Sequence, residues 1–467
     1  MHALIAAPPI ATARAVPRVP VPLDELFSIA HAMLQHERLA DAESLLNHIV
    51  SACPEAASAL HLKGVVLFRT NRPEAAASLI ERAIELAPDV LEFRRNICPV
   101  YERLGRYEDA IRIGYEVLDC DPYDLQTLQN LALVHYRKLE LDQSSACSRR
   151  ALALNPRAPG PHFQLAETLL LRGEFTEGWQ EYEWRYRIAG AAPPLPPTDH
   201  PQWNGESMSG RLLLVADQGF GDAIQFSRYI PWASERCPDL IVAADVSLQP
   251  LIGQIAPVKL VSRWELCPPF AAYCPLSGLP RLHGTVLDNV PNKVPYLHAD
   301  PARVSVWRER LRDLTPSGVR RIGIAWAGRP IHNNDLNRSA GLAAFAPLAK
   351  MEGIVLISLQ KGAAQRAIST YFDQAPLLNI GSMVSGFADT MAIIESLDLV
   401  VTVDTAVAHL AGAMAKPVWI LLPYAPDWRW LLNRDDSPWY PTARLFRQPL
   451  AGEWGPVGMA VRDALRC

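Results

Sequence analysis

The sequence predicts an α-solenoid followed by an α/β region, and three observations support this prediction. A pattern of paired helices returns every 34 residues through the first part of the chain. Short aliphatic runs separated by helical segments come after it, as in parallel sheets that are covered on both faces. All twelve tryptophans lie at or after Trp179, so the composition changes where the two regions meet. We therefore expect a repeat array joined to two parallel-sheet lobes.

The bulk properties indicate a globular protein without a nucleic-acid partner. A length of 467 residues suffices for two or three domains, and the net charge of −4 gives no electrostatic attraction to nucleic acid or an anionic membrane. We expect the eight cysteines to be mainly buried free thiols, which fits a reducing, cytoplasmic location. The apolar stretch 397–423 contains Asp398, Asp404 and Lys416, and these charges argue against a membrane span.

The first residues differ in composition from the rest of the chain. Residues 1–22 are rich in Ala and Pro, and Pro8 and Pro9 interrupt the apolar stretch that a secretory signal needs. We expect a disordered arm over 1–22.

The repeat array is expected over residues 23–188 as five units. Prolines that end the second helix of a unit stand at Pro54, Pro88, Pro122 and Pro156. Small residues that let helices pack closely stand at Ala30, Gly64, Cys98, Ala132 and Ala166, and at Ala42, Ala76, Ala110, Ser144 and Gly178. This pattern resembles tetratricopeptide repeats. In the fifth unit Arg185 replaces a small or aliphatic residue, and we expect this unit, with Trp179 and Trp184, to dock on the next domain.

Three consecutive units carry a side-chain amide at their sixth position, namely Asn96, Asn130 and Gln164. Stacked helix pairs form a concave surface suited to extended peptides, and amides on it can bond a peptide backbone without reading its sequence. A solvated polar face is the alternative. The row is similar to the asparagine ladder of the O-linked GlcNAc transferases, which implies acceptor binding by the repeats.

A proline-rich linker at 189–206 leads into the α/β region. Aliphatic runs that predict buried strands lie at 211–216, 239–244 and 257–261, and then at 321–326, 353–359, 397–403 and 417–422. The two series predict an N-terminal lobe over 207–300 and a C-terminal lobe over 318–467. Ligands of open parallel sheets bind at the carboxyl ends of strands, so the loops there are the candidate site.

Two of these loops carry candidate site residues. In the loop after the first strand, Gly219 and Gly221 permit a tight turn before a helix that starts near Asp222. The turn suits an anion, although a plain helix cap by Asp222 is equally consistent with it. In the loop after 397–403, Thr405 and Ala406 present N–H groups at a helix start, which favours an anion.

The second loop also carries a histidine. His409 lies four residues after Thr405, so it projects from the same helix face. A histidine, which is able to carry a positive charge, suits a nucleotide diphosphate when it lies beside a helix start. A half-buried histidine that bonds a neighbouring carbonyl is the alternative.

Together these loops resemble a known family. Gly221 and Asp222 with Pro231 nine residues later look like the N-lobe loop of ADP-heptose transferases, and DTAVAHLAGA (404–413) is similar to their DxGxxHxAxA donor loop, with Ala406 in place of glycine. The segments SLQKG, FADT and DWRW (358–362, 387–390 and 427–430) resemble tetratricopeptide-repeat proteins with a heptosyltransferase-like domain. The resemblance covers the chain after the arm.

This resemblance implies a GT-B fold of two Rossmann-like lobes and inverting sugar transfer without a metal or cofactor, with a nucleotide-sugar as donor substrate. Asp222 would be the general base on the acceptor hydroxyl. The donor-binding set would be Gly219, Gly221, Gly328, Arg338, Lys361, Asp404, Thr405, Ala406 and His409. Within it, Arg338, Lys361, His409 and the N–H groups at 405–406 would balance the charge of the leaving diphosphate, and Gly328 would allow close phosphate approach. Asp404 would bond a sugar hydroxyl or fix its loop.

The sequence leaves three functions open. The first is transfer to a serine or threonine of a protein held by the repeats, with flagellin or another surface protein as the expected acceptor. The second is the same chemistry on a glycan, with the repeats recruiting a cell-envelope complex. The third is a non-catalytic scaffold with a decayed transferase domain. The presence of Asp222, Asp404, Thr405 and His409 argues against decay, whereas Ala406 favours it.

Overall fold

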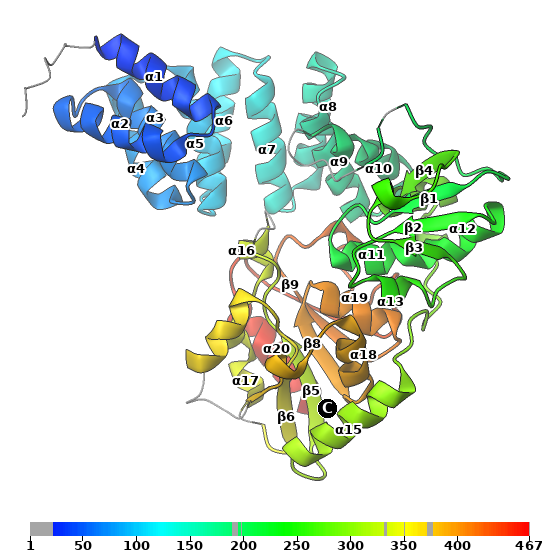
Figure 1. Cartoon of the computed structure of the whole chain (residues 1–467). Helices are drawn as coiled ribbons and strands as arrows, with labels where there is room; N and C mark the ends of the chain where they lie inside the picture. The colour runs from blue at the N-terminus through cyan, green and yellow to red at the C-terminus, as the bar shows by residue number, and fades with distance from the viewer. Residues whose placement is uncertain are drawn as a thin grey trace, which may run out of the picture. The chain divides into compact units, whose positions relative to one another are not determined.

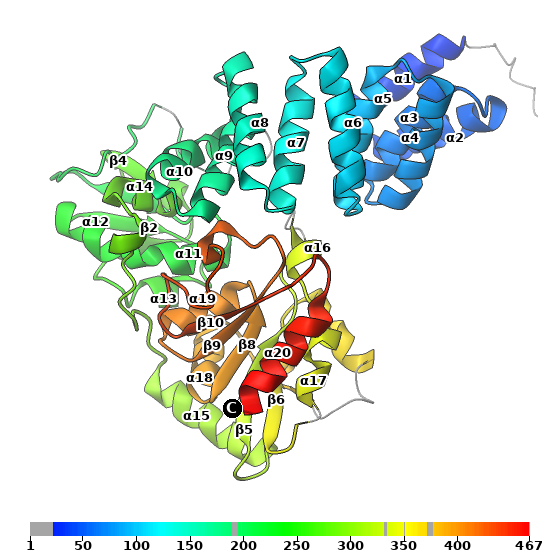
Figure 2. The same cartoon turned by 180° about the vertical axis from the view of Figure 1, so that it is seen from behind.

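The computed structural model describes residues 22–188, 195–197, 199–330, 334–349, 351–370 and 377–466. The chain forms two compact units, Met1–Pro122 and Tyr123–Cys467 (Figures 1 and 2). The expected arm, except for Pro22, lies outside the described residues, as do 189–194 and Thr198 of the expected linker.

The first unit consists of three helix pairs. They are α1 (Leu23–Gln35) with α2 (Leu39–Ala52), α3 (Ala57–Arg69) with α4 (Pro73–Leu86), and α5 (Leu91–Arg103) with α6 (Tyr107–Cys120). The small residues Ala30, Ala42 and Ala76 are fully buried where neighbouring helices approach each other. The first three prolines of the 34-residue series each stand two positions after a second helix, as their effect on helices predicts.

The second unit begins with two more helix pairs, α7 (Leu125–Arg137) with α8 (Leu141–Leu154), and α9 (Pro159–Arg172) with α10 (Phe175–Tyr182). The 3₁₀ helix η1 (Glu183–Arg187) continues α10. Ten helices thus occupy the five predicted repeats, and the predicted helical solenoid is confirmed. Its fourth and fifth repeats belong to the same compact unit as the sheets.

Two all-parallel sheets come after the repeats. The first has the order β3-β2-β1-β4 and the second the order β10-β9-β8-β5-β6-β7. Their strands are β1 (Leu212–Val215), β2 (Leu240–Ala243), β3 (Lys259–Val261), β4 (Ala272–Pro275), β5 (Arg320–Ala325), β6 (Ile354–Ser358), β7 (Leu377–Asn379), β8 (Leu399–Val403), β9 (Val418–Leu422) and β10 (Ala443–Arg447). The helices among them are α11 (Phe220–Phe226), α12 (Ile230–Arg236), α13 (Gln249–Ile252), α14 (Leu279–His283), α15 (Pro301–Leu314), α16 (Asp335–Arg338), α17 (Ala346–Ala349), α18 (Phe387–Glu395), α19 (Ala406–Ala413) and α20 (Trp454–Arg466).

All seven predicted strands are present, and three further strands are not predicted from the sequence. Of these, β4 ends in a proline, β7 has three residues, and β10 carries arginines at its second and fifth positions. Each lies at the edge of its sheet. An edge strand needs no continuous aliphatic run, so it lacks the pattern that identifies central strands.

Helices cover both faces of the six-stranded sheet (Figures 1 and 2). Ile322, Ile324 and Val401 pack towards α17 and α20, whereas Val400 and Ile420 pack towards α15, α18 and α19. The second of these cores is continuous with residues of α9 and α10 and with the four-stranded sheet. The last two repeats and both sheets therefore share one hydrophobic core.

Two further observations concern the described part of the chain. The seven cysteines within it are free thiols, and Cys120 at the end of α6 is exposed rather than buried. None of its helices combines the length and apolar character needed to cross a membrane.

Candidate functional site

The two candidate loops meet where two helices begin. Helix α11 comes after β1 and helix α19 after β8, and their first turns are in contact. Gly221 lies against the second helix so closely that a Cβ there would be 2.7 Å from Cδ2 of His409 and 3.6 Å from Cα of Ala406. The site thus lies at the carboxyl ends of strands from both sheets, where ligands of parallel sheets bind.

Gly221→Ala is expected to separate these two helices. His409 is buried and held by Tyr440, so it cannot yield to the new methyl group, and overpacking of this kind costs about 1–3 kcal/mol. Gly455→Ala is the matched control, because the added Cβ would meet no described atom within 4 Å beyond its chain neighbours and the backbone of its own helix. Chemical denaturation of both variants checks this. Equal stability of the two would contradict the close contact.

Asp222 has a fixed orientation in the first turn of α11. Its Oδ2 accepts a hydrogen bond from N–H of Gly219 at 3.0 Å, and its Oδ1 is in an ion pair with Nη2 of Arg429. The side chain is 25% exposed. Burial raises the pKa of Asp222 above that of a free aspartate, and the charge of Arg429 opposes this rise. The carboxylate is therefore a stronger base than an exposed one.

Arg429 connects three groups and was not predicted as a site residue. It lies in the 3₁₀ helix η9 (Trp428–Trp430) and is 6% exposed. Besides its bond to Asp222, Nη1 donates to both oxygens of Asp427 at 2.8 and 2.9 Å, and Nε donates to Gln225 at 2.5 Å. Asp222 of one lobe and Asp427 of the other are thus joined by one buried cation.

The histidine of the second loop is buried and hydrogen-bonded. The imidazole Nδ1 of His409 shares a hydrogen bond of 2.9 Å with the hydroxyl of Tyr440, and its Nε2 lies 3.7 Å from Asp404. Burial, helped by the charge of Arg429, lowers the pKa of His409 well below 6.5. This shift favours the uncharged ring over the cation. At neutral pH His409 is an uncharged hydrogen-bonding group, and the buried positive charge of the site belongs to Arg429.

Asp404 is the second carboxyl group of the site. It stands directly after β8 and is 7% exposed. Burial, together with the negative charge of Asp427, raises the pKa of Asp404 to about 6, although Arg338 and Arg429 act against this rise. A substantial fraction of this carboxyl group is thus protonated in weakly acidic solution and is then able to donate a hydrogen bond.

The start of α19 has the local geometry expected for it. Thr405 is the N-cap residue, and its hydroxyl accepts a bond from N–H of Val407 at 3.3 Å. Ala406 is the first helical residue and, like Thr405, is partly exposed. The N–H groups at this helix start lie beside Gly221 and provide a partial positive charge.

Gly328 and Arg338 lie next to each other. A Cβ on Gly328 would be 2.5 Å from Nη2 of Arg338 and 2.6 Å from Oδ1 of Asp335. Among the described residues, Arg338 forms one ion pair, and this pair is long, with 3.4 Å between Nε and Oδ1 of Asp335. Its charge acts on both Asp404 and His409, so it lies near the start of α19. The absence of a side chain at Gly328 thus leaves room for the guanidinium group of Arg338.

Lys361 is in a different situation, because its ammonium group is engaged by the protein. Nζ donates to the carbonyl of Gly381 at 2.9 Å and to that of Val384 at 2.8 Å. The neighbouring Gln360 bonds the N–H groups of Trp326 and Ala327, both at 2.9 Å. Lys361 therefore holds the chain before α18. This contact is not part of its expected role, which was to bind the nucleotide-sugar.

The fifth repeat docks on the sheets as expected. Nε1 of Trp179 donates to the carbonyl of Thr285 at 2.9 Å, and its ring packs edge-on against Trp428 with centroids 5.1 Å apart. Trp184 instead stacks on His162 of α9 at 3.8 Å, so it stabilises the repeat itself. The docking surface therefore reaches η9, which carries Arg429.

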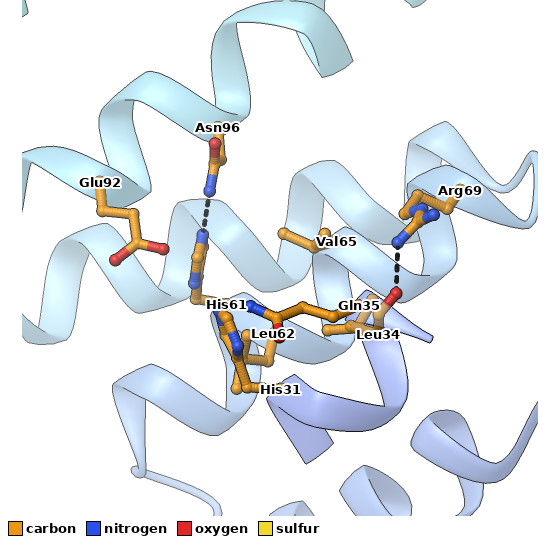
Figure 3. A pocket seen from close by; sticks show the side chains of 9 residues that line it. All are labelled: His31, Leu34, Gln35, His61, Leu62, Val65, Arg69, Glu92 and Asn96. Atoms are coloured by element: carbon orange, nitrogen blue, oxygen red, sulfur yellow. Dashed lines mark hydrogen bonds between the residues drawn. The ribbon is translucent and has the colours of Figure 1, made fainter. Parts of the chain in front are cut away.

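The first unit contains a groove of about 220 Å³ lined only by the first helices of its three repeats, α1, α3 and α5. Its lining residues, drawn in Figure 3, are His31, Leu34, Gln35, His61, Leu62, Val65, Arg69, Glu92 and Asn96. Nδ2 of Asn96 donates to Nε2 of His61 at 3.0 Å, and burial lowers the pKa of His61 to about 4, so this ring is neutral. The bond fixes the Asn96 amide while leaving its oxygen for a ligand.

The other two amides lie in the second unit. Asn130 is partly exposed on α7, whereas Gln164 on α9 is 6% exposed. Nδ2 of Asn130 and Nε2 of Gln164 are buried and have no hydrogen-bond partner among the described groups. Of the three predicted amides, Asn96 is the one that lines a described groove.

Comparison with known proteins identifies the repeats. Residues 27–90 match the tetratricopeptide repeat family model. Among solved structures, PilF of Pseudomonas aeruginosa is 21% identical, with 36% of this chain and 76% of that chain covered and a TM-score of 0.33. TPR repeat-containing thioredoxin TTL4 of Arabidopsis thaliana is 27% identical over 126 residues, which are 27% of this chain and 18% of TTL4.

One relative matches most of the chain. Protein FlbA of Caulobacter vibrioides is 26% identical over 470 residues, which cover 86% of this chain and 77% of FlbA. A match of that extent includes the α/β region as well as the repeats. The chain therefore contains tetratricopeptide repeats in its N-terminal part and is similar to FlbA over most of its length.

Proposed function

We propose that this protein is an inverting, metal-independent glycosyltransferase of the GT-B type, which moves a sugar from a nucleotide-sugar to a hydroxyl group of a protein held by its repeats. The observation that carries the proposal is the meeting of Asp222 and the start of α19 at the carboxyl ends of two parallel sheets. A base and a site for a diphosphate are the two parts that such a transfer requires.

In the proposed reaction, Asp222 takes the proton of the acceptor hydroxyl as its oxygen attacks the anomeric carbon. The bond between that carbon and the diphosphate breaks, and the leaving diphosphate takes the bonding electrons. The raised pKa of Asp222 supports its role, because a carboxylate with a higher pKa accepts a proton more readily. Its partial exposure leaves it accessible to an acceptor.

The charge of the leaving diphosphate needs a counterpart. The N–H groups at Thr405 and Ala406 are oriented by the helix, and the ion pair that Arg338 forms with Asp335 is long, at 3.4 Å. Neutral His409 can donate a hydrogen bond, and protonated Asp404 can bond a sugar hydroxyl. We place the diphosphate against the start of α19, between Gly221 and Arg338.

A non-catalytic scaffold is the second candidate, and one observation favours it. Asp222 is already ion-paired with Arg429, and the ammonium of Lys361 is bonded to two carbonyls. In a transferase these contacts have to coexist with bound substrates. In a scaffold they would simply stabilise the fold.

Nucleotide binding separates the two candidates. The protein is mixed with ADP, UDP, GDP or CMP, and its thermal unfolding is monitored. One nucleotide is expected to stabilise the folded state by about 2.7 kcal/mol at a hundred times its dissociation constant. If none of the four changes the unfolding temperature, the transferase proposal fails and the scaffold remains. Transfer is then measured with sugar derivatives of the nucleotide that binds.

Asn96→Ala tests the acceptor side of the proposal. The change removes the groove amide and its bond to His61, which corresponds to about 1 kcal/mol, or a several-fold weaker acceptor affinity. Nucleotide affinity should be unchanged. Asn47→Ala on the exposed face of α2 is the matched control. Binding of candidate acceptors, flagellin first, is measured by calorimetry. Equal acceptor affinity of the two variants would remove the groove from the proposal.

A further inference from the structure

The fifth repeat is bonded to the loop that carries the proposed base. Asp217, in the loop after β1, is buried and accepts bonds from the hydroxyl of Tyr186 at 2.8 Å and from N–H of Ser277 at 3.1 Å. The oxygen that bonds Tyr186 is Oδ2, and it also accepts a hydrogen bond from the hydroxyl of Ser277. Tyr186 belongs to η1 of the fifth repeat, so repeat, loop and the end of β4 are joined at this carboxylate.

Arg185 of the same repeat is a buried cation with a fixed orientation. Nη1 donates to the carbonyl of Tyr182 at 2.6 Å, and Nη2 donates to the hydroxyl of Ser277 at 2.6 Å. The guanidinium lies 4.2 Å from the ring centroid of Tyr182 and 3.9 Å from that of Tyr186. Because its other donors are bonded, Nε is directed at one remaining acceptor, the side chain of Gln218.

Gln218 completes a chain of hydrogen bonds that ends at Asp222. In one of the two orientations of its amide, both the oxygen and the nitrogen have suitable hydrogen-bond partners. In this orientation the oxygen accepts from Nε of Arg185 at 3.2 Å, and the nitrogen donates to Oδ1 of Asp222 at 3.1 Å. The hydroxyl of Tyr182 lies 3.0 Å from the amide oxygen in this orientation. Two residues of the repeat thus hold the amide that faces the carboxylate.

We propose that Arg185, acting through Gln218, positions the carboxylate of Asp222, so that the fifth repeat is a working part of the catalytic site and not only a holder of the acceptor. This inference rests on the proposed transferase function. Gln218 and Arg429 both donate to Oδ1. Oδ2 accepts from N–H of Gly219 and keeps a lone pair, so it is the oxygen that receives the acceptor proton.

The experiment uses the full-length protein with Gln218→Leu, which keeps the side-chain volume and removes the amide. Loss of the donor to Asp222 should lower kcat by about tenfold and leave KM for the donor within about twofold. The acidic limb of the pH–rate profile should move to higher pH, because a hydrogen bond to the charged form of the carboxylate is lost. Gln180→Leu, on the exposed outer face of α10, is the control and should match the wild type.

Arg185→Lys provides an independent measurement, since it keeps the charge but lacks the Nε donor. We expect the same shift of the acidic limb with a smaller loss of kcat. The charged and titratable groups that face Asp222 from neighbouring elements are unchanged in both variants, and these are Asp217, Asp427, Arg429 and Tyr182. A shift of the limb that both variants show therefore arises from the chain through Gln218, because Gln218→Leu leaves the other bonds of Arg185 in place.

The possible failures are distinguishable. A wild-type protein that binds no nucleotide and transfers no sugar overturns the proposed function itself. An active wild type whose Gln218→Leu and Arg185→Lys variants keep its kcat and pH profile overturns only the positioning role. Should Gln218→Leu fold poorly, the profile of Arg185→Lys decides the question alone.

Discussion

Asp222→Asn is expected to reduce sugar transfer by about 10²–10⁴-fold, the usual contribution of a general base. The fold should persist, because an asparagine oxygen still accepts the hydrogen bond from N–H of Gly219. Arg429 also keeps its hydrogen bonds to Asp427 and Gln225. Nucleotide affinity should be retained for the same reason. The rate of transfer and nucleotide binding are measured on the same preparation, so that loss of chemistry is separated from loss of the site.

The pH profile gives the same prediction a second measurement. Asp222 must be ionised to act as a base, and burial raises its pKa above the 3.8 of a free aspartate. The wild-type rate should therefore fall as the pH is lowered through that raised pKa, and the residual rate of the Asn variant should lack this limb. Asp245→Asn is the control, since this aspartate lies after β2 but bonds only Ser247 on an exposed turn. If the Asp222→Asn variant transferred sugar at the wild-type rate, Asp222 would have no part in the mechanism.

Arg429→Met has the second largest expected effect, and it acts on stability and on transfer together. The substitution removes the bonds to Asp222, Asp427 and Gln225 and leaves carboxylates without their buried partner. Breaking a buried ion pair from one side costs about 3–5 kcal/mol. The pKa of Asp222 should rise further, because Arg429 is the charge that lowers it, so the acidic limb of the rate profile should move to higher pH.

Arg434→Met is the control for this variant. Arg434 pairs with Asp436, whose side chain is 66% exposed, and exposed pairs contribute about 0–1 kcal/mol. Chemical denaturation and the rate of transfer are measured for both variants. If Arg429→Met were as stable as Arg434→Met and transferred sugar at the wild-type rate, the bridge between the lobes would be of no consequence.

The regular features of the structure could be predicted because each depends on a local pattern. The 34-residue period identifies the repeats, since a helix pair has to bury the same small residues each time. The aliphatic runs identify the central strands. The loops of Asp222 and His409 could be singled out one at a time because both come directly after central strands.

The charge state of the site could not be predicted, because it depends on residues distant in the sequence. His409 is neutral owing to burial against Tyr440 and the nearby Arg429. Lys361 is engaged by carbonyls some twenty residues further along the chain. Arg429 lies within the segment DWRW (427–430). Its position two residues after Asp427 and between two tryptophans was the available signal that it is buried and paired.

The shared core of the last two repeats and the sheets has a consequence for engineering. Under the proposed function, redirecting the protein to a new acceptor by exchanging repeats requires a junction that leaves the second unit whole. Such a chimera should be joined at Pro122 and Tyr123 and should retain the native helices from α7 onward. A graft that also replaced α9, α10 and η1 would discard Trp179 and Arg185 and uncover the apolar surface against which they pack. The exchangeable recognition module is thus three repeats long, not five.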